Sequence, residues 1–263
     1  MSKKVSVLIR NKNQKDSLKF LLKNLNNRYK EDIDEIIVID NESVDGSIEI
    51  AEEMGAKVVT IVDFGYGSSA NLAATSASHE IVVMFSAHSF PVSQDFFQII
   101  KAKFNENDNL AGVRAVHRSG DYKLMINGIK SKDDPNRAGL MFCGSAFSKE
   151  VWRKHPFKDD IVTFEDKEWT VRVLNEGYDV EMVPAVFCYD LKRSQASNYK
   201  RFKDETLGNR DIWGKKVTIG QVFLKMGRSW FGYFKIFLIE TYYVFKTGFF
   251  LLWYVLFEQS KNK

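Results

Sequence analysis

The sequence predicts an α/β protein with a mostly parallel sheet, helices on both faces of that sheet, and a helical C-terminal extension. Short apolar runs recur four times in the first part of the chain, and the segments between them carry apolar residues three and four positions apart. Strands that alternate with helices in this way form parallel sheets whose faces are covered. With 263 residues, 44% of them hydrophobic, the chain is long enough to bury one sizeable core.

Four strands are expected from the apolar runs, because these are rich in β-branched residues and too short to be buried helices. The runs are the segments 5–9, 35–39, 57–61 and 80–85. Ligands of parallel sheets bind beyond the carboxyl ends of the strands. Residues that directly follow each run are therefore the first candidates for a functional site.

The helices between the strands follow from the spacing of apolar residues on one face. These faces are Leu18, Leu21, Leu22 and Leu25; then Ile48, Ala51 and Met54; then Phe97, Ile100 and Phe104. Gly55 ends the second of these helices, and Ser93 opens the last. A further helix is expected over about residues 67–78.

Polar residues stand where two of the strands end. Asp40 ends the second strand, and the segment 86–88, Ser-Ala-His, ends the fourth. A carboxylate at this edge, one strand over from Asn11, is suited to accept hydrogen bonds from a base or a ribose. Asp45 and Ser47 are expected to cap the helix that follows them.

The stretch "GYGSSA", residues 65–70, formally matches the G-x-G-x-x-G/A fingerprint of dinucleotide sites. That fingerprint belongs after the first strand of a unit and needs an acidic residue about 20 positions later. Here the segment 86–88 occupies the position of the acidic residue. A loop that leads into a helix N-terminus is therefore the better interpretation.

Glu165 and Asp166 are adjacent carboxylates at the start of an expected helix that contains Trp169 and Val173 and ends at Gly177. Acidic residues stabilise a helix N-terminus by about 0.3–1 kcal/mol. Two neighbouring carboxylates also provide a general base and a group that tunes it. The pair is therefore a candidate catalytic site as well as a capping feature.

The chain resembles the inverting family-2 glycosyltransferases with the GT-A fold in five ordered blocks. They are "VSVLIRNKN", "EIIVIDNESVDGS", "GSSANLAATSASHEIVVMFSAHSFP", "LMFCGSAFSKEVW" and "FEDKEWTVRVLNEGYDV". The resemblance implies a GT-A glycosyltransferase domain over residues 1–190 and an extension over 191–263. It implies inverting transfer of a sugar from a nucleotide-sugar to a hydroxyl, in the assembly of a bacterial-type surface polysaccharide or lipid-linked glycan.

The resemblance also assigns roles to residues. Asp166 takes the role of the general base, and Glu165 binds the acceptor or positions Asp166. Asn11 and Asp40 are expected to bind the nucleoside, and Ser86 and His88 are expected to bind the nucleotide further along, with His88 facing the diphosphate. Independently of the resemblance, the polar segment 116–140 has little periodicity and is expected to lack regular structure. Such a segment is either a functional lid, which would contact the acceptor or the donor sugar, or simply mobile.

The sequence departs from the family pattern at the end of the fourth strand. The family carries Asp-x-Asp there, which binds a divalent metal on the donor diphosphate, whereas this chain has Ser86, Ala87 and His88. An imidazole ligates Mn²⁺ or Zn²⁺ and Mg²⁺ prefers oxygen, so a metal at His88 is expected to be Mn²⁺ in preference to Mg²⁺. The alternatives are a His88 that only caps a turn, or a metal-independent site in which basic side chains neutralise the diphosphate. Candidates for that role are Lys192, Arg193 and Arg201.

A second departure follows the last block. Cys188 stands where the family often has a metal-binding His, and Asp190 follows two residues later. Either side chain is a candidate ligand, and Asp190 and Arg193 are the residues expected to assist at the diphosphate or metal. Packing explains Cys188 equally well.

Two other functional classes remain alternatives. A nucleotide-sugar-binding scaffold without catalysis is compatible with the missing Asp-x-Asp, although the intact pair of Glu165 and Asp166 disfavours it. A nucleotidyltransferase typically needs a glycine-rich phosphate loop near the first strand, and "LIRNKNQ" contains no glycine.

Cysteine usage indicates a reducing compartment. The chain has two cysteines, Cys143 and Cys188, without the spacing of a metal or redox motif. The first residues lead directly into a strand without an apolar signal core. A cytoplasmic location is therefore expected.

The C-terminal region combines positive charge with apolar residues. Residues 192–228 contain ten Lys and Arg against three Asp and Glu, and the most apolar segment, 229–257, follows. Its longest uncharged run, 247–257, has 11 residues, fewer than the roughly 20 that a bilayer crossing needs. A peripheral or monotopic segment on the inner face of the cell membrane is therefore expected. A helix pair packed on the domain is the alternative.

The expected partners are a nucleotide-sugar donor, a glycan or lipid-linked acceptor and the membrane surface, but no nucleic acid.

Overall fold

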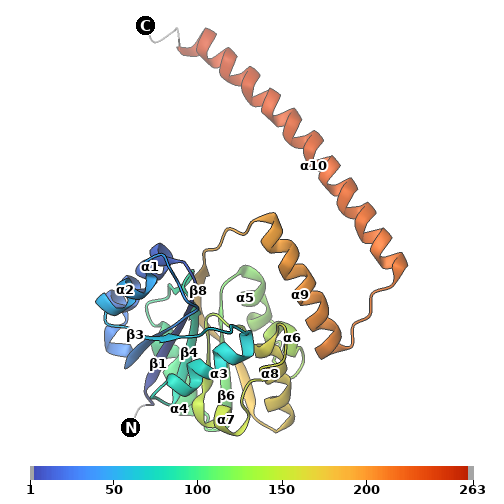
Figure 1. The fold of residues 1–263 in the computed structure, drawn as a ribbon. Helices are drawn as coiled ribbons and strands as arrows, with labels where there is room; N and C mark the ends of the chain where they lie inside the picture. Colours follow the sequence, from blue (N-terminus) through green and yellow to red (C-terminus); the bar gives the residue numbers. More distant parts are fainter. Residues whose placement is uncertain (1–2, 260–263) are drawn as a thin grey trace. The chain divides into compact units, whose positions relative to one another are not determined.

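The computed structural model describes residues 3–259 and separates into two compact units, with the division between Trp213 and Gly214. The first unit contains the sheet and the second is helical (Figure 1). The expected boundary at residue 190 lies inside the first unit, because helix α9 (Gln195–Trp213) packs there. Gly208 of α9 lies so close to the ring of Phe164 that an added Cβ would be 2.6 Å from it.

The strands are β1 (Val5–Asn11), β2 (Glu35–Asp40), β3 (Lys57–Thr60), β4 (Ile81–Ser86), β5 (Ser89–Pro91), β6 (Leu110–Val116), β7 (Ser145–Ser148) and β8 (Asp179–Tyr189). Within residues 3–259 they form one eight-stranded sheet in the order β3-β2-β1-β4-β7-β6-β8-β5. The first four strands pair in parallel, and β6 pairs in parallel with β8. β7 runs antiparallel to β4 and β6, and β5 runs antiparallel to β8. The predicted α/β class with a mostly parallel sheet is confirmed.

The helices of the first unit are α1 (Lys15–Arg28), α2 (Ser47–Glu53), α3 (Tyr66–Ser76), α4 (Phe96–Glu106), α5 (Ser119–Ile126), α6 (Pro135–Ala138), α7 (Lys149–Lys154), α8 (Glu165–Asn175) and α9. A short 3₁₀ turn, η1 (Lys30–Asp32), follows α1. The helices predicted from apolar spacing are all present, although α4 begins at Phe96 and not at Ser93. Asp45 accepts hydrogen bonds from the backbone and hydroxyl of Ser47 at the start of α2.

The segment 116–140 differs from the expectation, because it contains α5 and α6. The buried carboxylate of Asp121 in α5 binds the guanidinium of Arg114 in β6 at 2.9 Å, which ties the helix to the sheet. The side chain of Asp134 caps α6 by accepting from the backbone of Arg137 at 3.0 Å, and Pro135 occupies the first turn. Tertiary pairing and capping stabilise two helices here in the absence of a strong apolar period.

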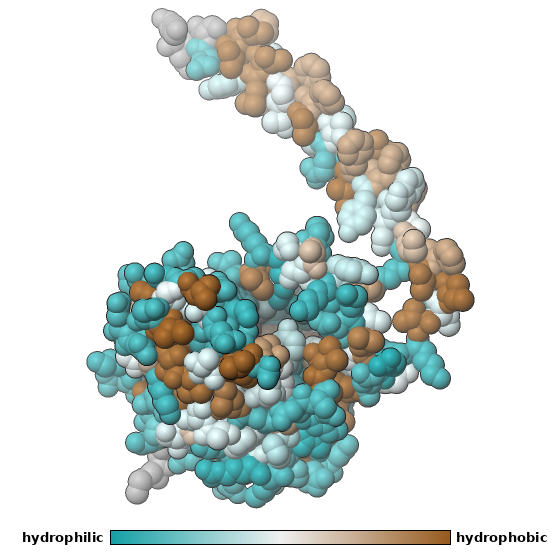
Figure 2. All heavy atoms as spheres, viewed as in Figure 1, coloured by the Kyte–Doolittle hydropathy of each residue, from teal (hydrophilic) through white to brown (hydrophobic). Residues whose placement is uncertain are grey.

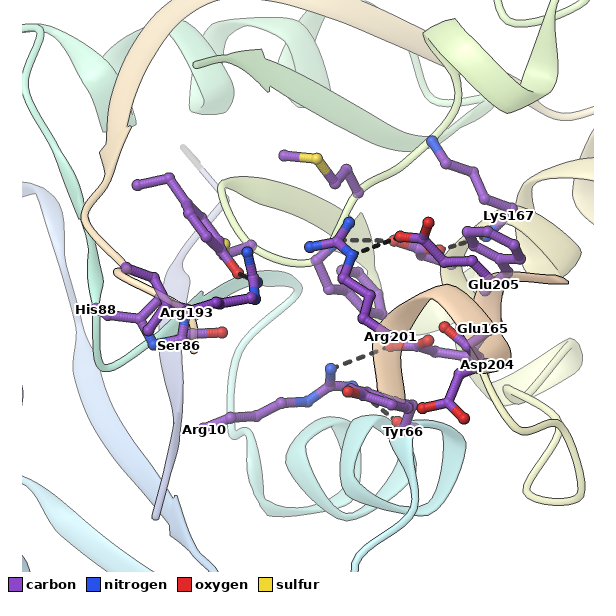
Figure 3. A pocket seen from close by; sticks show the side chains of 18 of the residues that line it. Arg10, Tyr66, Ser86, His88, Glu165, Lys167, Arg193, Arg201, Asp204 and Glu205 are labelled. Atoms are coloured by element: carbon purple, nitrogen blue, oxygen red, sulfur yellow. Dashed lines mark hydrogen bonds and ion pairs between the residues drawn. The ribbon is translucent and has the colours of Figure 1, made fainter. Parts of the chain in front are cut away.

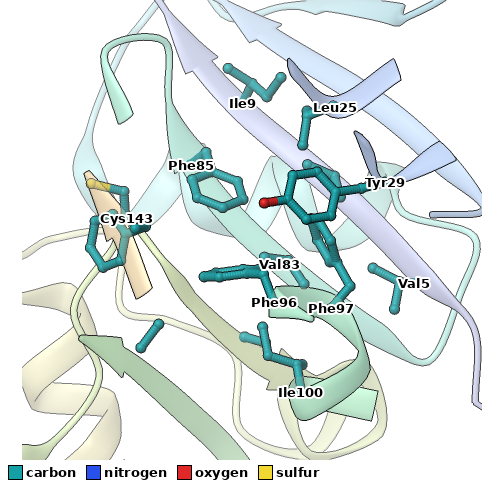
Figure 4. Close-up of a cluster of buried hydrophobic side chains, with 14 of the residues drawn as sticks. Val5, Ile9, Leu25, Tyr29, Val83, Phe85, Phe96, Phe97, Ile100 and Cys143 are labelled. Atoms are coloured by element: carbon teal, nitrogen blue, oxygen red, sulfur yellow. The ribbon is translucent and has the colours of Figure 1, made fainter. Parts of the chain in front are cut away.

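The core lies on both faces of the sheet. Successive strand residues alternate between faces, so Val83 and Phe85 pack with α1 and α4, whereas Val82 and Met84 pack with α3 and α8. On the first face, Tyr29 and Phe97 meet edge to face with ring centroids 5.2 Å apart (Figure 4). These two layers fix the strands whose ends carry the polar residues.

The second unit contains a single long helix, α10 (Ile219–Trp253), followed by a π-helical turn over Tyr254–Glu258. Thr218 caps it by accepting from the backbone of Gln221 at 3.3 Å. None of its described residues is buried, and apolar side chains are exposed along it (Figure 2). The structure therefore has one continuous helix where a helix pair was the alternative expectation. By length and composition the stretch Ile219–Glu258 is sufficient to cross a membrane, which the short uncharged run had disfavoured.

Candidate active site

A cavity of about 850 Å³ opens in the first unit where several strands end and α8 begins (Figure 3). Its walls come from the ends of β1, β4 and β8, the starts of α3 and α8, the β6–α6 region and one face of α9. Seven of the residues proposed for catalysis or donor binding line it: Asn11, Ser86, His88, Glu165, Asp166, Arg193 and Arg201. The strand ends and the carboxylate pair, far apart in the sequence, thus meet in one place.

Asp166 is held rigidly in the cavity wall. Its two carboxylate oxygens accept hydrogen bonds from the backbone N–H groups of Phe142 at 2.9 Å and Lys167 at 2.8 Å. The chain enters α8 through Phe164, which has a left-handed conformation with φ of 68°. A non-glycine residue in that region costs about 1–3 kcal/mol and is often found at active sites. The turn and the two donors together fix the carboxylate beside the cavity.

Glu165 forms a buried ion pair that connects α8 with β1. Its Oε1 lies 3.0 Å from Nη1 of Arg10, and Nη2 of Arg10 donates to the carbonyl of Tyr66 at 2.8 Å. The guanidinium also lies 5.5 Å from the ring centroid of Phe142. Burial raises the pKa of Glu165 to about 7, although the charge of Arg10 acts in the opposite direction. Sequence reasoning did not identify Arg10.

Lys167 is a second residue that sequence reasoning missed. Its ammonium group donates to the carbonyl of Gly139 at 2.9 Å and is almost fully buried. Burial lowers its pKa to about 7, and the nearby charge of Asp166 opposes that shift. Its position inside the motif "FEDKEW" was the only available signal, because sequence does not reveal burial of a lysine.

The two residues assigned to the nucleoside lie differently. Asn11 lines the cavity and donates to Asp40 at 2.7 Å, whereas Asp40 is fully buried and does not line the cavity. Ser43 donates to both carboxylate oxygens of Asp40 through its backbone at 2.7 Å and its hydroxyl at 2.8 Å. Among the described residues, the buried Oδ1 of Asn11 has no hydrogen-bond partner. The geometry therefore favours Asn11 as the ligand contact and Asp40 as the residue that orients it.

His88 and Arg193 lie together beside Ser86 (Figure 3). Nδ1 of His88 lies 2.7 Å from Oε1 of Gln14, and its ring meets that of Tyr189 edge to face at 4.9 Å. Arg193 donates to the hydroxyl of Tyr189 at 2.6 Å. Burial and then the charge of Arg193 lower the pKa of His88 to about 4, so the imidazole is neutral at pH 7.

The donor set at this edge does not fit a divalent metal. Across residues 3–259, no three His, Cys, Asp or Glu side chains are grouped to hold an ion. Cys188 and Asp190, the other candidate ligands, do not line the cavity. One imidazole and the hydroxyl of Ser86 are a poor set for Mn²⁺ or Mg²⁺. The neighbouring guanidinium of Arg193 would also repel a cation.

The cavity wall is strongly basic. Its Lys and Arg residues are Arg10, Lys12, Arg114, Arg118, Arg137, Lys167, Arg193, Lys200 and Arg201. Part of the basic stretch that follows residue 191, expected to face lipid, therefore faces the cavity. Of the three basic candidates named from the sequence, Arg193 and Arg201 line the cavity and Lys192 does not.

The comparisons of this sequence with a family model and with a curated protein both match glycosyltransferases. Residues 6–152 match the family described as Glycosyl transferase family 2. A protein of Rickettsia bellii (strain RML369-C), described as an uncharacterized glycosyltransferase, is 32% identical over 113 residues. That region covers 42% of this chain and 37% of the relative, so the chain spans little more than a third of the relative's length.

Two solved structures have a similar fold. Mannosyltransferase PcManGT from Pyrobaculum calidifontis, in complex with GDP-Man and Mn²⁺, matches with a TM-score of 0.62 and 19% identity over 77% of this chain and 61% of that one. Glucosyl-3-phosphoglycerate synthase from Mycobacterium tuberculosis, in complex with Mn²⁺, UDP and glucosyl-3-phosphoglycerate, matches with a TM-score of 0.60 and 15% identity over 82% of each chain. At these identities the likeness establishes the GT-A fold alone.

Proposed function

The chain belongs to glycosyl transferase family 2, and on that basis we propose that it moves a sugar from a nucleotide-sugar donor to an acceptor hydroxyl with inversion at the anomeric carbon. The observation that carries the proposal is the carboxylate of Asp166, held in the wall of a large cavity by two backbone donors. A fixed carboxylate that faces a substrate-sized space is what a general base requires.

In the proposed reaction the acceptor hydroxyl attacks the anomeric carbon while its proton passes to Asp166. The bond between that carbon and the diphosphate oxygen breaks, and the nucleoside diphosphate leaves with the electron pair. Glu165, paired with Arg10, lies next to Asp166 in the chain and positions the base or binds the acceptor. Asn11 binds the nucleoside through its unpaired Oδ1, and Asp40 orients Asn11.

We propose in addition that α10 brings the enzyme to a membrane. Its apolar side chains are exposed along the whole described helix, and Lys225, Arg228, Lys235 and Lys246 add positive charge. Such a helix associates with anionic lipid at the inner face of the cell membrane. An acceptor carried on a lipid, as in the assembly of surface polysaccharide or lipid-linked glycan, suits that location.

The function is tested by incubating the purified full-length protein with a panel of UDP-, GDP-, dTDP- and CMP-sugars and measuring release of the nucleotide. Release from one donor is expected, and Asp166→Asn should lower turnover by roughly 10²–10⁴-fold while donor binding stays near the wild-type value. Glu168→Gln is the matched control on the same helix, because Glu168 binds Arg172 at 3.0 Å and does not line the cavity. More than a tenth of wild-type turnover in Asp166→Asn would show that Asp166 is not the base.

A scaffold without catalysis is the second candidate, favoured by Ser86 and His88 at the end of β4. It predicts that a nucleotide-sugar raises the melting temperature but that the wild-type protein releases no nucleotide. The same donor panel therefore separates the two candidates.

A further inference from the structure

We propose that the guanidinium of Arg193, and not a divalent metal, binds the diphosphate of the donor at the end of β4. The inference rests on the proposed glycosyl transfer and specifies how its leaving group is held. Four features of the described residues carry it: the poor fit of the donor set to a metal, the position of Arg193, its lack of an ion pair with a carboxylate, and the neutral side chains of His88 and Tyr189 beside it.

The position of Arg193 is the first argument. Ser86 ends β4, and Ser86, His88 and Arg193 line the cavity side by side (Figure 3). The diphosphate of a nucleotide bound beyond the carboxyl ends of β1 and β4 lies at this edge. Arginine presents planar N–H donors that match two phosphate oxygens at once.

The second argument is that Arg193 is held without being neutralised. Its Nη2 donates to the hydroxyl of Tyr189 at 2.6 Å, and its guanidinium carbon lies 5.4 Å from the centroid of that ring. Within the described residues it has no ion pair with a carboxylate. Arg201 and Arg10, by contrast, are paired with Glu205 and Glu165. Arg193 is therefore oriented by a neutral group and keeps its full charge for a ligand.

His88 supports the same arrangement. Its Nδ1 faces the acceptor Oε1 of Gln14, so Nδ1 carries the proton and Nε2 carries a lone pair. That Nε2 is buried and has no partner among the described residues. The imidazole therefore adds no charge, and Arg193 supplies the positive charge at the end of β4.

The chemistry requires this charge. When the bond between the anomeric carbon and the diphosphate oxygen breaks, negative charge grows on the leaving group, and an oriented cation in a partly buried site stabilises it. In a site with a metal, the ion stabilises the charge on the leaving diphosphate. In this proposal the guanidinium of Arg193 stabilises that charge without an ion.

The test measures binding of UDP and GDP to the full-length protein by calorimetry, once in excess EDTA and once with Mn²⁺ or Mg²⁺. Wild-type protein is expected to bind one nucleoside diphosphate equally well in EDTA. Arg193→Gln should weaken that binding by roughly 10- to 100-fold and leave binding of the matching nucleoside, which has no phosphate, unchanged. The fold of each variant is checked by its melting temperature.

Two further variants sharpen the result. Lys192→Gln removes a neighbouring positive charge that does not line the cavity, and it should bind like the wild type. His88→Ala removes the imidazole beside Arg193, and binding of the nucleoside diphosphate to this variant should stay independent of Mn²⁺ and Mg²⁺, because His88 is not a metal ligand in this proposal.

The outcomes distinguish the inference from the function on which it rests. If a nucleoside diphosphate binds only when Mn²⁺ or Mg²⁺ is present and His88→Ala abolishes that dependence, the metal holds the diphosphate and the inference is wrong, while glycosyl transfer stands. Equal losses in Arg193→Gln and Lys192→Gln would reduce the effect to general electrostatics and also overturn it. If no nucleoside diphosphate binds with or without metal, the proposed function itself fails.

Discussion

Lys167 connects the ionisation of the site with the stability of the protein. Its ammonium group is buried, and that burial lowers its pKa from 10.5 to about 7. Between these two values the unfolded chain binds more protons than the folded one, so stability attributable to Lys167 rises as the pH increases from about 7 towards 10.5. The folded protein tolerates the neutral amine better than the ammonium ion.

The first prediction is that wild-type protein becomes more stable between pH 7 and pH 9 relative to the variant Lys167→Met, which has no such titration. Urea unfolding at the two pH values measures the difference. Lys23→Met, which removes an exposed lysine of α1, should retain the wild-type pH dependence. A Lys167→Met variant with the same pH dependence as the wild type would contradict the argument.

The ion pair of Arg10 and Glu165 gives the second prediction. Removal of Arg10 alone leaves a buried carboxylate without its partner, so Arg10→Met should destabilise the protein by about 3–5 kcal/mol. The double variant Arg10→Met with Glu165→Met should cost clearly less than the sum of the two single changes. The free energy of unfolding is measured with denaturant for the wild type, the two single variants and the double variant, which together form a double-mutant cycle. If the two single effects add up to the effect of the double change, the pair is not coupled.

The location of some of these residues could be predicted from the sequence, and that of others could not. Asp166 and Asn11 were expected at the site because motif order places them at the ends of elements, and both line the cavity. Asp40 was predicted to contact the ligand, but its carboxylate oxygens already accept hydrogen bonds from Asn11 and Ser43. Asn11 lies on another strand, so this pairing depends on the tertiary structure and is not visible in the sequence. Arg10 was missed because its partner Glu165 is distant in the sequence.

At the scale of elements, α3 packs unusually closely against the loop that precedes α8. A Cβ added to Gly67 would lie 1.9 Å from the carbonyl oxygen of Lys158. The second glycine of "GYGSSA", Gly67, therefore allows a close backbone contact, and the start of α3 lies beside the cavity through Tyr66. This contact explains a motif that resembles a dinucleotide fingerprint without its context.

The third prediction follows from that contact. Gly67→Ala should destabilise the protein by about 1–3 kcal/mol, because the helix and the loop must separate to admit the methyl group. Gly120→Ala is the matched control in α5, where an added Cβ meets its nearest atom at 3.8 Å. The control should be neutral or slightly stabilising, since alanine favours a helix over glycine. Similar melting temperatures for the two variants would refute the packing argument.

The elements themselves were predictable where local pattern and fold agree. Strands β1 to β4 each contain a short apolar run, and the buried residues of α1 are Leu18, Leu21, Leu22 and Leu25. Helices α5 and α6 were missed because Asp121 stabilises the first through Arg114 of another element and Asp134 caps the second. Helix α9 is mostly polar and has no continuous apolar face, and its place against Phe164 through Gly208 follows from tertiary packing.

At the scale of the whole molecule, the two units differ in what they expose. The first buries its apolar residues in two layers, whereas α10 exposes large apolar side chains along its described length. A helix of this kind in water needs a partner surface, and its positive residues favour anionic lipid.

The fourth prediction is that the full-length protein sediments with vesicles that contain anionic lipid and that salt releases part of it. A chain that ends at Trp213 should remain in the supernatant and still bind the nucleotide, because the first unit contains the whole cavity lining. Extraction at alkaline pH then separates a helix that lies on the surface from one that crosses the bilayer. A truncated chain that sediments like the full-length protein would exclude α10 as the anchor.

Arg193 and α9 lie in a part of the chain that the family match does not cover. The match to the family ends at residue 152, yet the cavity takes Arg193, Lys200 and Arg201 from beyond it. Under the proposed role of Arg193, the residue that binds the diphosphate lies outside the matched segment, whereas Ser86 and His88 lie inside it. Under the proposed role of Arg193, an ancestor could exchange an ion for a guanidinium by altering the segment after β8 together with the end of β4. Under that proposal, the ion requirement of a homologue is to be read from the end of β4 and the segment after β8 together, and not from the family match alone.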